Sequence, residues 1–132
     1  NNEKVSYALL DFVKGLCESF GGVIELPESQ FSIFSVIAAC SPAYTFMFID
    51  SMARGAVLNG MAKEQALKIS AQAVLGRAKM MLESEENPWA LINSVCSPGG
   101  TTIEGIATLQ NEKFDKAVMD AVQASYEKDK KL

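Results

Sequence analysis

The sequence contains no histidine and only three cysteines among its 132 residues. Without histidine, the chain cannot supply a serine–histidine or cysteine–histidine nucleophile pair. A zinc site would depend on Cys17, Cys40 and Cys96, which lack the short paired spacing of zinc ligands. We therefore expect no metal, and the odd number of cysteines fits a protein of the reducing cytoplasm.

Positive charge is also scarce. Lys and Arg number 12 against 16 Asp and Glu, which leaves a net charge of −4, whereas nucleic-acid binding needs a clustered basic face. The longest apolar run, 43–58, is interrupted by Asp50 and Arg54 and is shorter than the roughly 20 residues of a membrane span. We therefore expect neither nucleic acid nor a membrane as a partner.

Most of the chain shows helical periodicity. The spacing of apolar residues predicts helices over 6–19, 31–39, 42–58, 63–84 and 88–95, and from Phe114 onward. Ser6 and Ser41 are the expected caps of the first and third, and Pro42 suits a first helical turn.

A short strand is predicted at 23–26, closed by Pro27. A lone strand cannot satisfy its backbone hydrogen bonds. Either this assignment is wrong or the rest of its sheet lies outside the chain. Because the sequence also opens with Asn1 rather than methionine, we expect a fragment.

The helix over 63–84 carries many small residues. Its apolar seam has heptad-like spacing and consists of Leu67, Ala71, Val74, Ala78 and Met81. A neighbouring helix can therefore approach closely. That neighbour is either another helix of the same chain or a second subunit, and the many small residues on so few helices favour the second subunit slightly. The helix over 42–58, apolar on most sides, is either central to a bundle or buried against a second subunit.

The stretch CSPGGTTIEGI (96–106) places two glycines before a predicted helix start. Thr101 and Glu104 match a capping box. Free amides at a helix start, together with the helix dipole, form a site for a carboxylate or phosphate. The alternative is a plain turn, because Pro-Gly pairs commonly mark turns.

Three stretches together resemble one family. They are SPGGTTIEGI (97–106), SPAYTFMFIDSMARGAVLNGM (41–61) and ALKISAQAVLGRAKMMLES (66–84). In order and spacing they resemble the C-terminal half of pyrroline-5-carboxylate reductase, and the resemblance covers essentially the whole chain. It implies an all-α fold: residues 28–132 would be a helical dimerisation domain like the C-terminal domain of 6-phosphogluconate dehydrogenase. Residues 1–27 would be the last helix and strand of a dinucleotide-binding, Rossmann-type domain.

The resemblance also implies an activity. Family enzymes reduce 1-pyrroline-5-carboxylate, a small cyclic imine, to L-proline with NADPH or NADH in the cytoplasm, as homodimers or higher oligomers. The residues implied to bind the substrate carboxylate are Ser97, Gly99, Gly100, Thr101 and Thr102. The Thr102 hydroxyl is the implied catalytic group, close to the ring nitrogen. No G-x-G-x-x-G occurs in the sequence, so we expect the isolated chain to be inactive.

One departure concerns the segment before the third predicted helix. The family usually has Gly-Ser-Gly-Pro-Ala-Tyr in a loop near the nicotinamide, whereas this chain has Ala39, Cys40 and Ser41 before Pro42. Cys40, Ser41 and Pro42 are the implied cofactor contacts. Tyr44 is expected to pack with its hydroxyl satisfied.

Two other functions stay open at this point. The chain could be a stand-alone helical dimerisation module without catalysis. It could also be the helical domain of a related dehydrogenase that acts on another small carboxylate.

Overall fold

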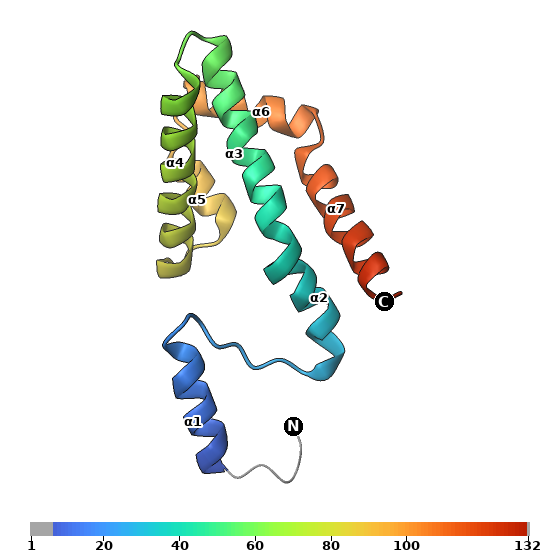
Figure 1. Cartoon of the computed structure of the whole chain (residues 1–132). Coiled ribbons are helices and arrows are strands. Elements are labelled where there is room, and N and C mark those ends of the chain that lie inside the picture. Colours follow the sequence, from blue (N-terminus) through green and yellow to red (C-terminus); the bar gives the residue numbers. More distant parts are fainter. Residues whose placement is uncertain (1–6, 132) are drawn as a thin grey trace. The chain divides into compact units, whose positions relative to one another are not determined.

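The computed structural model describes residues 7–131, and every regular element among them is helical (Figure 1). The chain divides into two compact units, the first ending at Phe31 and the second beginning at Ser32. Each unit is described by itself.

The first unit contains helix α1 (Tyr7–Glu18), which confirms the first predicted helix. The predicted cap Ser6 lies outside the described residues. The Glu25 carboxylate accepts a hydrogen bond from the Lys14 ammonium, and the two form an exposed ion pair. This contact raises the pKa of Lys14 and lowers the pKa of Glu25, first through the hydrogen bond and then through the opposite charges.

The predicted strand at 23–26 is not seen among the described residues. These residues are not paired in any ladder, and no strand occurs between residues 7 and 131. Val23 and Ile24 are exposed. Their sequence suits a strand, but a strand exists only where a second one accepts and donates the ladder hydrogen bonds. None of the described residues does so.

A single helical run extends from Glu28 to Leu58. It consists of the turn η1 (Glu28–Gln30), helix α2 (Phe31–Ser35), the π-helical turn η2 (Val36–Cys40) and helix α3 (Ser41–Leu58). The helix predicted over 31–39 is thereby confirmed. Helix α3 begins at Ser41 with Pro42 in its first turn, as predicted, but Ser41 is not a cap, because the helical run passes through both residues without a break.

The π-helical turn explains how the helix tolerates Pro42. Proline has no amide hydrogen, and its ring clashes with the carbonyl four residues earlier. Directly before it, the amide of Ser41 donates to the carbonyl of Val36, five residues back. The Ser41 hydroxyl donates to the carbonyl of Ile37 at 2.5 Å. The widened turn thus keeps polar backbone groups paired on the N-terminal side of the proline.

Helix α4 (Lys63–Glu83) packs against α3 after a tight turn at Gly60, whose φ is +94°. The closest packing is between small residues: Ala53 and Ala66 are each 1% exposed, and Ser70 is 5% exposed. Here the small side chains of α4 therefore allow close packing against another helix of the same chain, α3. Of the predicted seam, only Leu67 and Val74 are half-buried, and Ala71, Ala78 and Met81 are exposed.

The C-terminal helices are α5 (Pro88–Ser94), α6 (Thr101–Asn111) and α7 (Phe114–Asp129). The Asn87 side chain caps α5 by accepting from the amide of Ala90 at 3.0 Å, which agrees with the predicted start. Lys113, with a left-handed φ of 59°, forms the corner between α6 and α7.

Helix α7 packs along the helical run Glu28–Leu58 through contacts near both of its own ends. Near its C-terminus, the Ser32 hydroxyl donates to the Asp129 carboxylate at 2.6 Å. The hydroxyls of Tyr44 and Ser125 lie 2.5 Å apart, so the expectation of a satisfied Tyr44 hydroxyl is confirmed. Near its N-terminus, the ring of Phe114 lies 5.9 Å from that of Phe48, between centroids.

The run Glu28–Leu58 is long and apolar enough to cross a membrane by length and composition alone. A core helix of a soluble protein passes the same test. Here the run contacts both α4 and α7, and α3 carries the Asp50–Arg54 ion pair. The hydropathy of this run is therefore weak evidence for a membrane.

Candidate functional site

The stretch between α5 and α6 forms a tight turn. The amide of Gly100 donates to the carbonyl of Ser97 at 3.0 Å. Pro98 occupies the second position of this turn and Gly99, with a φ of +67°, the third. A type II turn favours proline and glycine at these two positions, because proline already has the required φ and glycine tolerates a positive one. Pro98 and Gly99 are thus explained by the turn alone.

Helix α6 begins one residue earlier than the capping box requires. Gly100 is the cap residue, with extended φ −80° and ψ 167°, and no side chain caps the helix. The predicted capping box of Thr101 and Glu104 is therefore wrong, since Thr101 is already the first helical residue. As a result, the amides of Thr101, Thr102 and Ile103 have no acceptor among residues 7–131.

These three amides have the geometry of an anion site. Amides of a first helical turn point away from the helix body along its axis. The hydroxyls of Thr101 and Thr102 are on exposed residues, as is that of Ser97, and none has a partner among the described residues. The stretch 97–103 therefore offers free amide and hydroxyl donors within seven consecutive residues, which suits a carboxylate or phosphate oxygen.

Gly100 is required for a different reason from Gly99. A Cβ atom built on Gly100 would lie 2.3 Å from the Ser97 hydroxyl oxygen and 3.1 Å from the Ser97 carbonyl oxygen. A Cβ atom on Gly99 would meet nothing within 4 Å. The Ser97 hydroxyl thus occupies the space beside Gly100. Among the amides of residues 100–103, that of Gly100 is paired, because it donates to the Ser97 carbonyl.

The implied cofactor contacts lie in a different part of the second unit. Cys40 ends the π-helical turn, and Ser41 and Pro42 begin α3. The segment is helical, so the loop that the resemblance implies there is not found. Figure 1 shows α6 running from the α4 side to the start of α7, while η2 lies between α2 and α3. The larger contacts of η2 are with α3 and α7.

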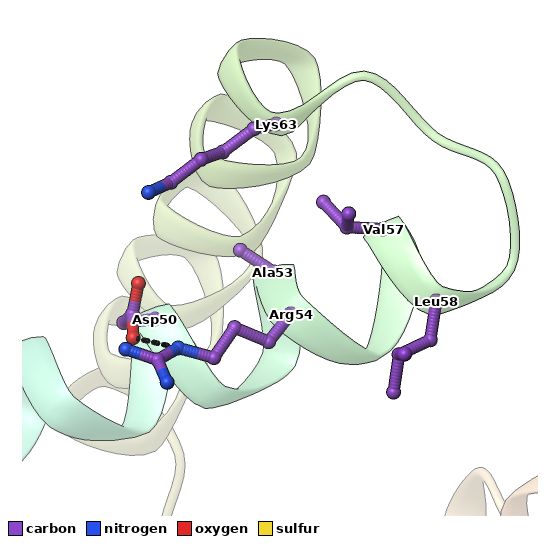
Figure 2. A pocket seen from close by; sticks show the side chains of 6 residues that line it. All are labelled: Asp50, Ala53, Arg54, Val57, Leu58 and Lys63. Carbon is purple, nitrogen blue, oxygen red and sulfur yellow. Dashed lines mark hydrogen bonds and ion pairs between the residues drawn. The ribbon is translucent and has the colours of Figure 1, made fainter.

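A second candidate place is a hollow of about 330 Å³ at the end of the α3–α4 hairpin (Figure 2). Its lining consists of Asp50, Ala53, Arg54, Val57, Leu58 and Lys63. Arg54 donates to the Asp50 carboxylate at 2.6 Å. Figure 2 shows Lys63 extending from the first turn of α4 on the same side as this pair. The sequence shows Asp50 and Arg54 as the charged residues that interrupt an apolar run, but it does not indicate Lys63, because only the hairpin brings Lys63 close to them.

No group of three or more potential metal ligands lies together among residues 7–131. The thiols of Cys17, Cys40 and Cys96 are free. The candidate site is therefore the turn at 97–102, which is built from backbone amides and hydroxyls.

Comparison with known families gives one match over most of the chain. A family model described as pyrroline-5-carboxylate reductase dimerisation matches residues 28–132. The pyrroline-5-carboxylate reductase of Escherichia coli (strain K12) is 46% identical over 120 residues, which are 91% of this chain and 45% of that protein. The reductase of Aquifex aeolicus (strain VF5) is 42% identical over 120 residues, with the same two shares.

Solved structures give a similar result. The crystal structure of 1-pyrroline-5-carboxylate reductase from Streptococcus pyogenes matches with a TM-score of 0.90 and 37% identity, over 99% of this chain and 51% of that one. The Plasmodium falciparum pyrroline carboxylate reductase, solved with NADP bound, matches with a TM-score of 0.88 and 32% identity, over 98% and 52%. The chain thus spans about half the length of the relatives it matches.

Proposed function

The chain belongs to the pyrroline-5-carboxylate reductase family, and from this premise we propose that it forms the dimerisation and substrate-binding part of a reductase that converts 1-pyrroline-5-carboxylate to L-proline. The supporting observation is the turn before α6, where the amides of Thr101, Thr102 and Ile103 are unpaired. A carboxylate is the one charged group of this substrate, and a helix start is a favourable place for it.

The site residues act by binding and orienting the substrate. The free amides and the hydroxyls of Ser97 and Thr101 hold the carboxylate. The Thr102 hydroxyl, one residue further along α6, donates to the ring nitrogen and so orients the imine carbon. Fixing a reactant in the reactive orientation removes a large entropic part of the barrier. No nucleophile is needed, which suits a chain without histidine.

The residues described do not form a site for NADPH or NADH. The chain has no G-x-G-x-x-G. Of the implied contacts, the Ser41 hydroxyl is engaged with the Ile37 carbonyl, and Pro42 has no amide hydrogen. We therefore propose that cofactor binding depends on a domain outside these 132 residues, with residues 1–27 as the end of that domain, and that the isolated chain is inactive. The reductase is proposed to be a cytoplasmic homodimer, or a higher oligomer built from dimers, with a 6-phosphogluconate-dehydrogenase-like helical domain.

The test is a chimeric enzyme. The N-terminal part of the Escherichia coli relative, which this chain does not cover, is joined to this chain at the matching position. NADPH oxidation is then measured with pyrroline-5-carboxylate. We expect activity in the chimera and none in the isolated chain.

Two matched variants of the chimera test the assignment of Thr102. Thr102→Val removes the proposed donor and should lower kcat/KM at least tenfold. Thr108→Val, on the same helix, removes a hydroxyl that only donates to the Glu104 carbonyl and should leave kcat/KM unchanged. Equal effects of the two substitutions would contradict the assignment. An active chimera that prefers another imino or keto acid would instead favour a related dehydrogenase, and an inactive but dimeric chimera would favour a module without catalysis.

A further inference from the structure

Helix α7 contacts the helical run Glu28–Leu58 along one narrow stripe of its own surface. The residues that make these contacts are Phe114, Ala121, Ser125 and Asp129. At about 100° of rotation per residue, all four lie within about 80° of one another around the axis of α7. A stripe of this kind requires a matching stripe on the helix that it contacts.

The residues of the helical run that contact α7 lie on both sides of the π-helical turn η2. Before the turn, the Ser32 hydroxyl donates to the Asp129 carboxylate at 2.6 Å. After it, the Tyr44 hydroxyl lies 2.5 Å from that of Ser125 and 3.3 Å from the carbonyl oxygen of Ala121. The turn itself also contacts α7. Ser32 and Tyr44 must therefore lie on the same face of the run.

An uninterrupted α-helix would place Ser32 and Tyr44 on different faces. They are 12 residues apart in the sequence, which in an α-helix amounts to three full turns and about 120° more. In η2, however, the amide of Ser41 donates to the carbonyl five residues back, that of Val36. A π-helical turn thus takes up one residue more than an α-helical turn and removes about 100° of rotation. The remaining angle between Ser32 and Tyr44 is about 20°.

Pro42 alone does not account for the π-helical turn. A proline inside a helix removes a hydrogen bond and clashes with the carbonyl four residues earlier, but a helix usually answers this with a kink or an end. A π-helical turn is rare. Val36, in this turn, is 1% exposed, so a change of rotation here would also move a buried side chain. The contacts with α7 are the feature that distinguishes the π-helical turn from a kink or a break.

We propose that the contacts with α7, rather than Pro42, hold residues 36–40 in the π-helical register, and that this turn sets the rotation of α3 relative to α2. Pro42 makes the turn tolerable, because it has no amide hydrogen that would be left unpaired. Packing of α7 and rotation of the start of α3 are then one coupled event. This inference does not depend on the proposed substrate or on a second subunit.

The first test is Pro42→Ala in the 132-residue chain. Two double-mutant cycles are measured by urea unfolding at one fixed chain concentration, Ser32→Ala with Asp129→Ala and Tyr44→Phe with Ser125→Ala. Each cycle gives a coupling factor, the ratio by which the unfolding constant of the pair departs from the product of the single effects. We expect both factors to be about 3–10-fold in the parent and to stay within about twofold of these values in Pro42→Ala. If either coupling is lost in Pro42→Ala, the proline and not α7 holds the turn, and the proposal is overturned.

A change of length by one residue supplies the matched pair of variants. Deletion of the exposed residue Ala38, made together with Pro42→Ala, leaves 11 residues between the two contacts, which is the number that a regular α-helix needs. This variant should keep both coupling factors. Insertion of one alanine after Ala38, also with Pro42→Ala, adds about 100° of rotation. It should raise the unfolding constant at least tenfold relative to Pro42→Ala. Loss of a coupling on deletion, or an insertion variant as stable as Pro42→Ala, would show that rotation does not decide the register.

Discussion

Replacing Gly100 by alanine separates the two reasons for having a glycine at the start of α6. Gly100 has φ −80° and ψ 167°, a conformation that alanine adopts freely. A new methyl group would, however, lie 2.3 Å from the Ser97 hydroxyl oxygen and 3.1 Å from the Ser97 carbonyl oxygen. It would also stand beside the free amides of Thr101 and Thr102, where the substrate carboxylate is proposed to bind.

The expected loss of stability follows from these two contacts. The Ser97 side chain is exposed and can rotate away, at about 0.5–1.5 kcal/mol if it leaves its preferred rotamer. The carbonyl must move by a few tenths of an ångström, which weakens the turn hydrogen bond, itself worth about 0.5–1.5 kcal/mol. Against these losses, alanine raises the free energy of unfolding by about 0.4–1 kcal/mol, because it gives the unfolded chain fewer conformations than glycine does. Gly100→Ala should therefore lower the free energy of unfolding by about 1 kcal/mol.

Removing the Ser97 hydroxyl should relieve most of this loss. In the Ser97→Ala background, the Cβ atom of residue 97 remains at 3.5 Å from the new methyl group, which is ordinary contact distance. We expect Gly100→Ala to cost at least 0.5 kcal/mol less there than in the parent. Gly99→Ala is the control: its cost of about 1–2 kcal/mol comes from the positive φ, so Ser97→Ala should not relieve it.

The assay combines urea unfolding of the 132-residue chain, at one fixed concentration, with the KM of the chimeric reductase. Gly100→Ala should raise KM about tenfold, equivalent to about 1.4 kcal/mol of lost binding. In the double variant, we expect stability to recover but KM to stay above that of Ser97→Ala alone. If KM recovers together with stability, Gly100 serves only the turn, and the carboxylate assignment at this position is refuted.

Three further predictions concern other parts of the chain. The hydroxyls of Tyr44 and Ser125 lie 2.5 Å apart, so Tyr44→Phe and Ser125→Ala should each lower the free energy of unfolding by about 1 kcal/mol. A double-mutant cycle should show a coupling energy of about 0.5–1.5 kcal/mol between them. Additive effects would contradict the contact. Lys113→Gly should raise the free energy of unfolding by about 1 kcal/mol, because Lys113 has a φ of 59°; a loss would show that its side chain contributes more than its backbone strain. The ion pair of Lys14 and Glu25 lowers the pKa of Glu25 and raises the pKa of Lys14. Its contribution to stability is therefore present at neutral pH and is lost as pH falls through the lowered pKa of Glu25 or rises through the raised pKa of Lys14. Amide hydrogen exchange of α1, measured across pH in the parent and in Glu25→Gln, should differ between the two, and an identical response would contradict the pair.

Local sequence patterns were sufficient for most helices of the chain. The cap at Asn87, the apolar spacing from Phe114 and the break at Gly60 act within a few residues of where they stand, so they are visible without a structure. The strand predicted at 23–26 is not seen, and Ser41 begins α3 but is not its cap, because both predictions depended on more than local preference. A strand needs a partner, and a Ser-Pro pair ends a helix only if the preceding turn cannot widen.

The candidate site, too, was predictable from local sequence only in part. The sequence was enough to predict a bare helix start at Gly99–Thr102, because the residue types alone imply a turn and free amides. It placed the cap one residue too late, since Gly100 rather than Thr101 takes the cap position. Nothing in the local pattern distinguishes these two choices, and the hydrogen bond from Gly100 to Ser97 decides between them.

By itself, the sequence determined the helical class, the order of the helices and the motif that carries the candidate site, because these depend on side chains close together along the chain. Only the tertiary structure decided which faces of those helices are covered. Ala66 and Ser70 are buried where α4 packs on α3, while Leu75 and Leu82, on the opposite face of the same helix, are 63% and 88% exposed. Both faces are apolar or small in sequence, and packing between segments distant along the chain, or between two chains, is what distinguishes them.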